Sequence, residues 1–554
     1  MSPAQARGLI ILTLSASLAA YLLGNARVGL WDRDEPRYAQ ASRQMLHSGD
    51  WVTPWYLNAW RAKKPPLVYW CQAASMAIFG DSGAAARFPS AVAIELTAML
   101  IAVGLWRTAG AARAAWTVLI FCTSALVIMA AKMSITDGIQ LLWIVICQIC
   151  LCRMRNDDMR KTPTPIATAV IFWISLGLGL LTKGMIPLVL IAAMLALAIL
   201  EVGPRWKERA AWLDAIRWWR RTRPVIGIPI AAAVVAPWVV LVHIRSPGFL
   251  TALAGEARGH SIEAAESHGG FPGYHTLLLA GTFFPWILLV PAAAVSAFQN
   301  RHRPEIRLAI AGFIGPWIVM ESLGTRLPHY VLPAFAPLAF LTANALQRAI
   351  DGDAKNLINR PRLLLMGTFI LSLFIIAFAV APWILAEYFH QIPVVPLVAS
   401  STIFFAIPAC LVRLAASRRV AGVAMILGLG MLCGFVTIYA LFIPAAPYLQ
   451  VSGLVADSLY AHGYDPSQGD VAMIDYKEPS LAFNLHGHAY EADDRDLVSM
   501  ADRASPRWAI TTSRDWDSLP PAVRSRLLVV SQSVGLFYNG SSHTVRIFVV
   551  RPGA

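Results

Sequence analysis

Long apolar runs recur along most of this chain, and they constrain its fold more than any other feature. Runs of about 18 or more apolar residues are long enough to cross a bilayer as helices. Of the 554 residues, 57% are hydrophobic and 14% are charged, whereas a globular chain in water carries about 25% charged residues. One water-exposed core cannot hide this much apolar surface, so the sequence predicts a mainly α-helical, polytopic membrane protein.

We expect about thirteen membrane-spanning helices. The first apolar run lacks a small-residue cleavage site, so we interpret it as a retained span rather than a removed signal peptide. The division between the fifth and sixth spans rests on Lys183 alone. The expected spans are 9–26, 86–106, 114–132, 138–153, 165–182, 184–201, 225–243, 275–298, 308–322, 331–348, 364–385, 395–413 and 422–443.

The distribution of basic residues predicts the orientation of these spans. Alternate loops are rich in arginine and lysine, as in 153–161 and 205–223, and loops of this kind stay on the cytoplasmic side. The other set of loops, 27–85, 244–274 and 323–330, is then external. This rule also accounts for the net charge of +14, so no nucleic-acid partner is expected.

The composition changes near residue 450. Short β-rich runs at 471–475, 508–512, 527–531 and 545–550 alternate with helical patterns at 453–462 and 494–502. Such alternation is typical of an α/β fold. We therefore divide the chain into a membrane domain, 1–449, and a small extramembrane α/β domain, 450–554.

The segment WDRDEPRYAQASRQMLHSGDW, 31–51, is unusually charged for its position after the first span. Pro36 suits the first turn of a helix, with Asp34 or Glu35 at its cap. An apolar stripe of Tyr38, Ala41, Met45 and Leu46 predicts a short amphipathic helix on the bilayer surface. A capping role explains one of the two acids but not both. For this segment, plain capping and a functional role are therefore equally open.

Further polar residues gather in the external segments. Lys63 and Lys64 precede a double proline, where lysines also serve simply as headgroup anchors. Asp137 lies at membrane depth, where a carboxylate is costly and suggests function, although it could cap a helix. Lys183 is an anchor or a functional cation. LGTRLPHYVLP, 323–333, adds Arg326, His329 and Tyr330, and 259–275 adds His268.

Acids and cations on one face of a many-spanning protein suit a particular chemistry. Lysine and arginine would hold the phosphate of a lipid-anchored sugar donor. Carboxylates would stabilise the positive charge that develops on the sugar during glycosyl transfer. The sequence therefore indicates a membrane glycosyltransferase.

Together these motifs resemble the membrane glycosyltransferases of the protein-mannosyltransferase type, which have the C-type glycosyltransferase fold. The succession DEPRYAQASRQMLHSGDW, KKPPLVYW, TKG and RLPHYVLPAFAPLA is most similar to the bacterial branch that transfers 4-amino-4-deoxy-L-arabinose from undecaprenyl phosphate to lipid A. The resemblance is densest over 30–350, and the thirteen spans with an external α/β tail also match that branch.

The resemblance implies roles for particular residues. Catalytic roles are implied for Asp34, Glu35 and Asp137. His268 is implied as a histidine of the large external loop, and a divalent cation there is an alternative that the residue spacing does not demand. Substrate-binding roles are implied for Arg37, Tyr38, Lys63, Lys64, Lys183, Arg326, His329 and Tyr330.

Two departures from the branch bear on the sugar. The branch usually has Glu-Lys before the double proline, whereas this chain has Lys63-Lys64. It also tends to carry Glu-His in the large external loop, where Glu256 is here followed by Ala257. Neither departure affects the class of reaction.

The expected protein is a monomeric glycosyltransferase of the bacterial inner membrane, with its active site and C-terminal domain in the periplasm. Its expected partners are an undecaprenyl-phosphate-linked sugar, a lipid A or other outer-face acceptor, and membrane lipid. The expected outcome is resistance to polymyxin and cationic peptides. An enzyme of the same fold acting on a protein or another glycan is the main alternative. A transporter is a weaker one, because we find no internal repeat of the kind transporters show.

Overall fold

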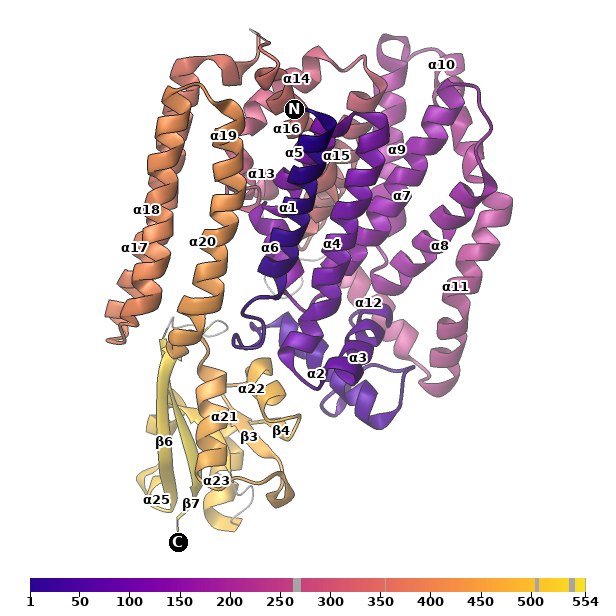
Figure 1. Cartoon of the computed structure of the whole chain (residues 1–554). Helices are drawn as coiled ribbons and strands as arrows, with labels where there is room; N and C mark the ends of the chain where they lie inside the picture. Colours follow the sequence, from indigo (N-terminus) through magenta and orange to yellow (C-terminus); the bar gives the residue numbers. More distant parts are fainter. Residues whose placement is uncertain (263–270, 354, 504–507, 538–543, 554) are drawn as a thin grey trace.

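A helical bundle carries a small α/β domain at one end in the computed structural model of the chain (Figure 1). The structure describes residues 1–262, 271–353, 355–503, 508–537 and 544–553. The two chain termini lie at opposite ends of the molecule (Figure 1). The predicted mainly helical class with a C-terminal α/β domain is therefore confirmed.

Within the described ranges, nine helices are long and apolar enough to span a membrane, and two bent pairs raise this number to as many as eleven. The bent pairs are α5 (Ala111–Cys122) with α6 (Ala125–Lys132), and α13 (Tyr274–Thr282) with the segment Trp286–Gln299. The predicted thirteen also include α8 (Ile166–Thr182) and α15 (Pro304–Ser322), and that number stays a prediction. The nine are α1 (Pro3–Leu22), α4 (Gly83–Thr108), α7 (Thr136–Met159), the run Ile186–Arg205 that contains α9 (Ile186–Val202), α11 (Pro224–Arg245), the run Pro328–Ile350 that contains α16 (Phe335–Ile350), α17 (Pro361–Tyr388), α18 (Val394–Ala416) and the run Val420–Ala445.

Helix α4 is central to the first half of the bundle, where it packs against α1, α5, α6 and α7. Small and polar residues allow the close approach, as expected between membrane helices. The Ser17 hydroxyl donates to Glu95 Oε2 at 3.0 Å, and the Tyr21 hydroxyl donates to the Cys122 carbonyl at 2.8 Å. The buried Glu95 carboxylate thus pairs with a neighbouring helix.

Helix α2 (Asp34–Ser48) forms where the sequence predicts an amphipathic helix, and Gly49 ends it at φ 70°. Arg33, not an acid, occupies the cap position, and both acids lie in the first turn. The expected stripe packs on protein rather than on a bilayer surface, because α3 (Leu67–Phe79) and α7 cover it. Tyr38 and Met45 lie in one cluster with Tyr69 and Ile139.

The C-terminal domain is a five-stranded mixed sheet with strand order β4-β3-β5-β7-β6. The predicted strands correspond to β3 (Val471–Ile474), β5 (Ala509–Thr512), β6 (Leu527–Leu536) and β7 (Thr544–Pro552). The predicted helices are α21 (Val451–Ala461) and α23 (Asp494–Arg503). Strand β4 (Ala489–Ala492) and helix α22 (Pro479–Asn484) were not predicted.

Helix α22 connects this domain to the membrane bundle by packing directly on α2. The Arg43 guanidinium lies 3.8 Å from the centre of the Phe483 ring and donates to the Phe483 carbonyl at 2.7 Å. It also pairs with Asp81 at 2.8 Å. The helix that begins at Asp34 is therefore held between the membrane bundle and the C-terminal domain.

Candidate active site

A polar cavity of about 130 Å³ lies at the N-terminal ends of α2 and α7. Six cationic side chains and three carboxylates line it, so it favours an anionic ligand. The lining consists of Arg33, Asp34, Arg37, Tyr38, Arg61, Lys63, Lys64, Met133, Ile135, Thr136, Asp137, Lys183, Glu256, Thr325, Leu327, His329 and Tyr330. Nine residues predicted as catalytic or substrate-binding meet here, although they come from distant parts of the chain.

Asp34 offers the more open carboxylate of the two predicted acids in the cavity. It is the first residue of α2, and its side chain is 53% exposed. Arg61 is its nearest cation, with Nη2 3.8 Å from Asp34 Oδ1. The Arg61 guanidinium is itself buried and lies 4.7 Å from the centre of the Tyr38 ring. Asp34 can therefore reach a substrate without first breaking a tight ion pair.

Asp137 is engaged instead, with a side chain only 9% exposed. Lys183 Nζ lies 3.0 Å from its Oδ1, and His329 Nε2 lies 3.7 Å from its Oδ2. The same ammonium lies 4.4 Å from the centre of the Tyr330 ring. Burial alone lowers the pKa of Lys183, but Asp137, Tyr330 and Asp34 together outweigh burial, so the pKa is raised. Asp137 thus keeps Lys183 charged and oriented.

Lys63 and Lys64 differ in their partners. Lys63 Nζ pairs with Glu256 Oε1 of α12 (Phe249–Ile262) at 2.7 Å. Within the described part of the chain, Lys64 has no hydrogen bond or ion pair. Burial, followed by repulsion from Lys183, lowers the pKa of Lys64 to about 8. A partly buried ammonium of this kind is stabilised by an incoming anion.

An apolar chamber of about 350 Å³ adjoins the polar cavity. The two share Lys63, Lys64, Asp137, Lys183 and Tyr330 in their walls. The rest of the chamber is mainly apolar and includes Leu141, Ile144, Val189, Leu250, Leu253, Met320, Leu323 and Leu332. A cationic head site continuous with an apolar chamber matches a phosphorylated lipid.

The structure does not bring Glu35 to the cavity. Its carboxylate is fully buried and forms a bidentate pair with Arg87 at 2.7 and 2.8 Å. The same oxygens accept from the backbone amides of Trp31 and Ser134 at 2.8 and 2.7 Å. Both oxygens are engaged, so Glu35 ties the segment before Asp34 to the loop before Asp137 and cannot contact a substrate in the cavity.

Two further predicted residues lie elsewhere. Arg326 is not among the described residues that line the cavity, although its neighbours Thr325 and Leu327 are. His268 lies outside the described residues. Over the described ranges, no group of three or more histidine, cysteine, aspartate or glutamate side chains is arranged to hold a metal ion.

Sequence reasoning missed Arg61 and Arg87. Arg61 stands two residues before the lysine pair in RAKKPP, so its proximity to the predicted site was a usable signal. Arg87 is a lone cation near the start of an apolar helix, where a charge requires a partner. That signal predicts a partner for Arg87 without identifying Glu35.

The helical bundle with its small C-terminal α/β domain defines a polytopic membrane protein of the C-type glycosyltransferase fold. Crystal structures of ArnT from Cupriavidus metallidurans, in the apo state and bound to undecaprenyl phosphate, superpose with TM-scores of 0.75 and 0.73. Each comparison covers 98% of both chains at 20% sequence identity. At this identity the likeness concerns the fold.

Sequence comparison narrows the class. A family model described as dolichyl-phosphate-mannose-protein mannosyltransferase matches residues 9–250. An undecaprenyl phosphate-alpha-4-amino-4-deoxy-L-arabinose arabinosyl transferase from Aeromonas salmonicida is 31% identical over 332 residues, which span 59% of this chain and 58% of the relative. The chain is thus similar to bacterial aminoarabinose transferases, as the sequence predicted, and it spans somewhat more than half the length of these curated relatives.

Proposed function

We propose that this chain is a glycosyltransferase that uses an undecaprenyl-phosphate-linked sugar. The observation that carries the proposal is the continuity of the cationic cavity with the apolar chamber through Lys64 and Lys183. The donor phosphate lies between these two ammonium groups, and the first isoprene units of its chain occupy the chamber. The cationic cavity suits any phosphate, but the apolar chamber suits a lipid chain and offers nothing to a water-borne nucleotide sugar.

The reaction transfers the sugar to an acceptor oxygen. A lipid A phosphate is largely ionised at neutral pH, since its second pKa is near 6, so it attacks the anomeric carbon without a strong base. The bond from that carbon to the donor phosphate oxygen breaks, and its electron pair goes to the phosphate held by the lysines. Attack from the face opposite the leaving phosphate inverts the anomeric carbon.

The two acids have different roles in this proposal. Asp34 stabilises the positive charge that develops at the sugar ring, because its carboxylate is open to the cavity. Asp137 orients Lys183 through their 3.0 Å ion pair. Glu35 and Arg87 position the segment that carries Asp34.

The sugar we propose is 4-amino-4-deoxy-L-arabinose, and the acceptor is a lipid A phosphate. The name of the Aeromonas salmonicida relative, an aminoarabinose transferase, supports this choice. The open carboxylate of Asp34 also suits a cationic amino sugar. The basic loops of the opposite set support a periplasmic site in the inner membrane. Modified lipid A carries less negative charge, which lowers its attraction for polymyxin.

Mass spectrometry of lipid A tests the proposal. Cells that make the aminoarabinose donor but lack their own transferase are given either this chain or its Asp34→Asn variant. We expect aminoarabinose on lipid A, and polymyxin survival, with the native chain alone. Unmodified lipid A in cells with the inserted native chain contradicts the substrate, and glycosylation of a protein or another glycan in those cells identifies the alternative acceptor.

A further inference from the structure

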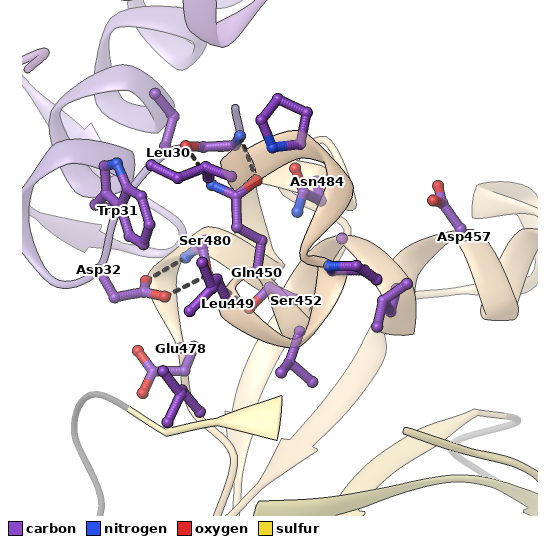
Figure 2. A pocket seen from close by; sticks show the side chains of 18 of the residues that line it. Leu30, Trp31, Asp32, Leu449, Gln450, Ser452, Asp457, Glu478, Ser480 and Asn484 are labelled. Atoms are coloured by element: carbon purple, nitrogen blue, oxygen red, sulfur yellow. Dashed lines mark hydrogen bonds between the residues drawn. The ribbon is translucent and has the colours of Figure 1, made fainter. Parts of the chain in front are cut away.

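The four consecutive residues 31–34 line two different cavities. Arg33 and Asp34 line the candidate active site, whereas Trp31 and Asp32 line a second cavity of about 260 Å³. This second cavity lies between the N-terminal loop and the C-terminal domain, and Figure 2 shows the side chains that meet there. A displacement of the C-terminal domain therefore acts on the same short segment that presents Asp34.

Asp32 is the point at which the domain holds this segment. Its Oδ1 accepts from the Ser480 backbone amide at 2.8 Å, and its Oδ2 accepts from the Ser480 hydroxyl at 2.5 Å (Figure 2). Hydrogen bonds to an ionised acceptor are about twice as strong as neutral ones. Burial raises the pKa of Asp32 to about 6, so the carboxylate depends on these donors to stay ionised at neutral pH.

Ser480 is anchored in turn within the C-terminal domain. It is 4% exposed, and its hydroxyl lies 2.6 Å from Ser452 Oγ. The Ser452 hydroxyl lies 2.8 Å from the Tyr476 hydroxyl. These three residues come from α22, α21 and the segment after β3. Asp32 is thus bonded to a buried polar chain that involves three parts of the domain.

Two other contacts hold the segment on either side of Asp32. Before it, Gln450 Oε1 accepts from the Gly29 amide at 2.8 Å, and Gln450 Nε2 donates to the Gly29 carbonyl at 3.1 Å (Figure 2). After it, Arg43 donates to the Phe483 carbonyl at 2.7 Å. The C-terminal domain therefore contacts the segment around Asp34 at three places, which are Gly29, Asp32 and Arg43.

The position of Asp34 is expected to depend on these contacts with the C-terminal domain. One residue separates it from Asp32, so the two α-carbons lie at most about 7 Å apart. Misplacement of a reacting group by about 1 Å can cost about 10²-fold in rate. Lys64, Lys183 and the apolar chamber belong to other segments, so binding of the lipid and its phosphate should depend little on the Asp32–Ser480 contact.

We propose that the C-terminal domain is a positioning element of the transferase, and that Asp32 and Ser480 are positioning residues that set Asp34 against the bound sugar. The proposal rests on the function proposed above. It assigns to the domain a role in the rate of transfer rather than in binding the donor lipid.

A double-mutant cycle on the full-length protein tests this role. Ser480→Ala and Asp32→Ala are expected to lower kcat by about tenfold or more, because misplacement weakens transition-state contacts. Affinity for undecaprenyl phosphate, measured separately, should stay within twofold of the native value. Since both changes remove one contact, the double variant should fall no further than the worse single variant.

Ser458→Ala is the matched control, because its hydroxyl contacts Ser531 inside the same domain at 2.5 Å. It should leave kcat unchanged. If Asp32→Ala fails to insert, Asp32→Asn replaces it in the cycle. The inference is overturned if Ser480→Ala leaves kcat unchanged or if Ser458→Ala lowers kcat as much as Ser480→Ala does. It is also overturned if the losses of kcat in the two single variants multiply in the double variant. Wild-type protein that makes no transfer at all overturns the proposed function instead.

Discussion

Asp34 and Glu35 are neighbours in sequence but belong to two different regions. Glu35 lies in a sealed network in which neither its side chain nor that of Arg87 is exposed. Asp34 lies at an open cavity with its nearest cation 3.8 Å away. The α-helical turn directs the two side chains apart, so one acid can hold the fold while the next remains available for chemistry. Neighbouring acids in a motif therefore need not share a role.

The largest effect is expected from breaking the sealed network. Arg87→Met leaves the buried Glu35 carboxylate without its cation, which costs about 3–5 kcal/mol of stability. Thermal unfolding in detergent measures this loss. The double variant Glu35→Gln/Arg87→Met should regain part of it, because no charge is left unpaired. Arg107→Met, at the exposed end of the same helix, is the control, and an equal loss there contradicts this explanation.

A substitution at Asp34, in the open cavity, should change the rate of sugar transfer rather than the stability of the protein. In the proposed mechanism Asp34 stabilises the charge on the sugar, so Asp34→Asn should lower the rate of transfer by about 10²–10³-fold. The unfolding temperature and the affinity for undecaprenyl phosphate should not change, since Asp34 is half exposed and loosely paired. A purified transfer assay measures the rate, and retained activity removes Asp34 from the proposed role.

A smaller effect is expected from the pH dependence of Lys64. Its pKa of about 8 means that its charge is present below pH 8 and is lost as the pH rises through that value. The phosphate ligand, with a second pKa near 6, is already fully ionised there. Affinity for undecaprenyl phosphate should therefore fall above pH 8, by up to about tenfold per pH unit.

Lys64→Arg is the control for this prediction. An arginine stays protonated at every pH in the range, so the fall in affinity between pH 8 and 9 should disappear. Binding titrations at pH 7, 8 and 9 measure both proteins. A fall that persists in Lys64→Arg assigns the titration to another group.

The smallest effect is expected at the rim of the open region. The Lys63–Glu256 pair is partly exposed, at 40% and 21%, and such pairs contribute about 0–1 kcal/mol. Glu256→Gln should therefore change the unfolding temperature little. Transfer rates for two lipid-linked sugars, one with and one without an amino group, show whether this rim discriminates between donors, and a large loss of stability contradicts the exposed character of the pair.

The sequence determined the fold class because helices that cross a membrane require long apolar runs, which are visible directly in the sequence. Apolar runs predicted the helices, and alternating β-rich and helical patterns predicted the strands β3, β5, β6 and β7. The cavity residues Asp34, Lys64, Asp137 and Lys183 stood out because a charge near a bilayer is costly and needs a reason. Their meeting at one place was implied by the resemblance and not by any local pattern.

The tertiary structure alone decided which polar residues face the cavity. Glu35 and Asp34 look alike in sequence, and only the position of Arg87 in α4 separates their roles. The amphipathic stripe of α2 specified a buried face but not that protein, rather than lipid, would cover it. The contact between Asp32 and Ser480 joins residues that are 448 positions apart. Such long-range pairing arises from packing of whole elements, and no short stretch of sequence encodes it.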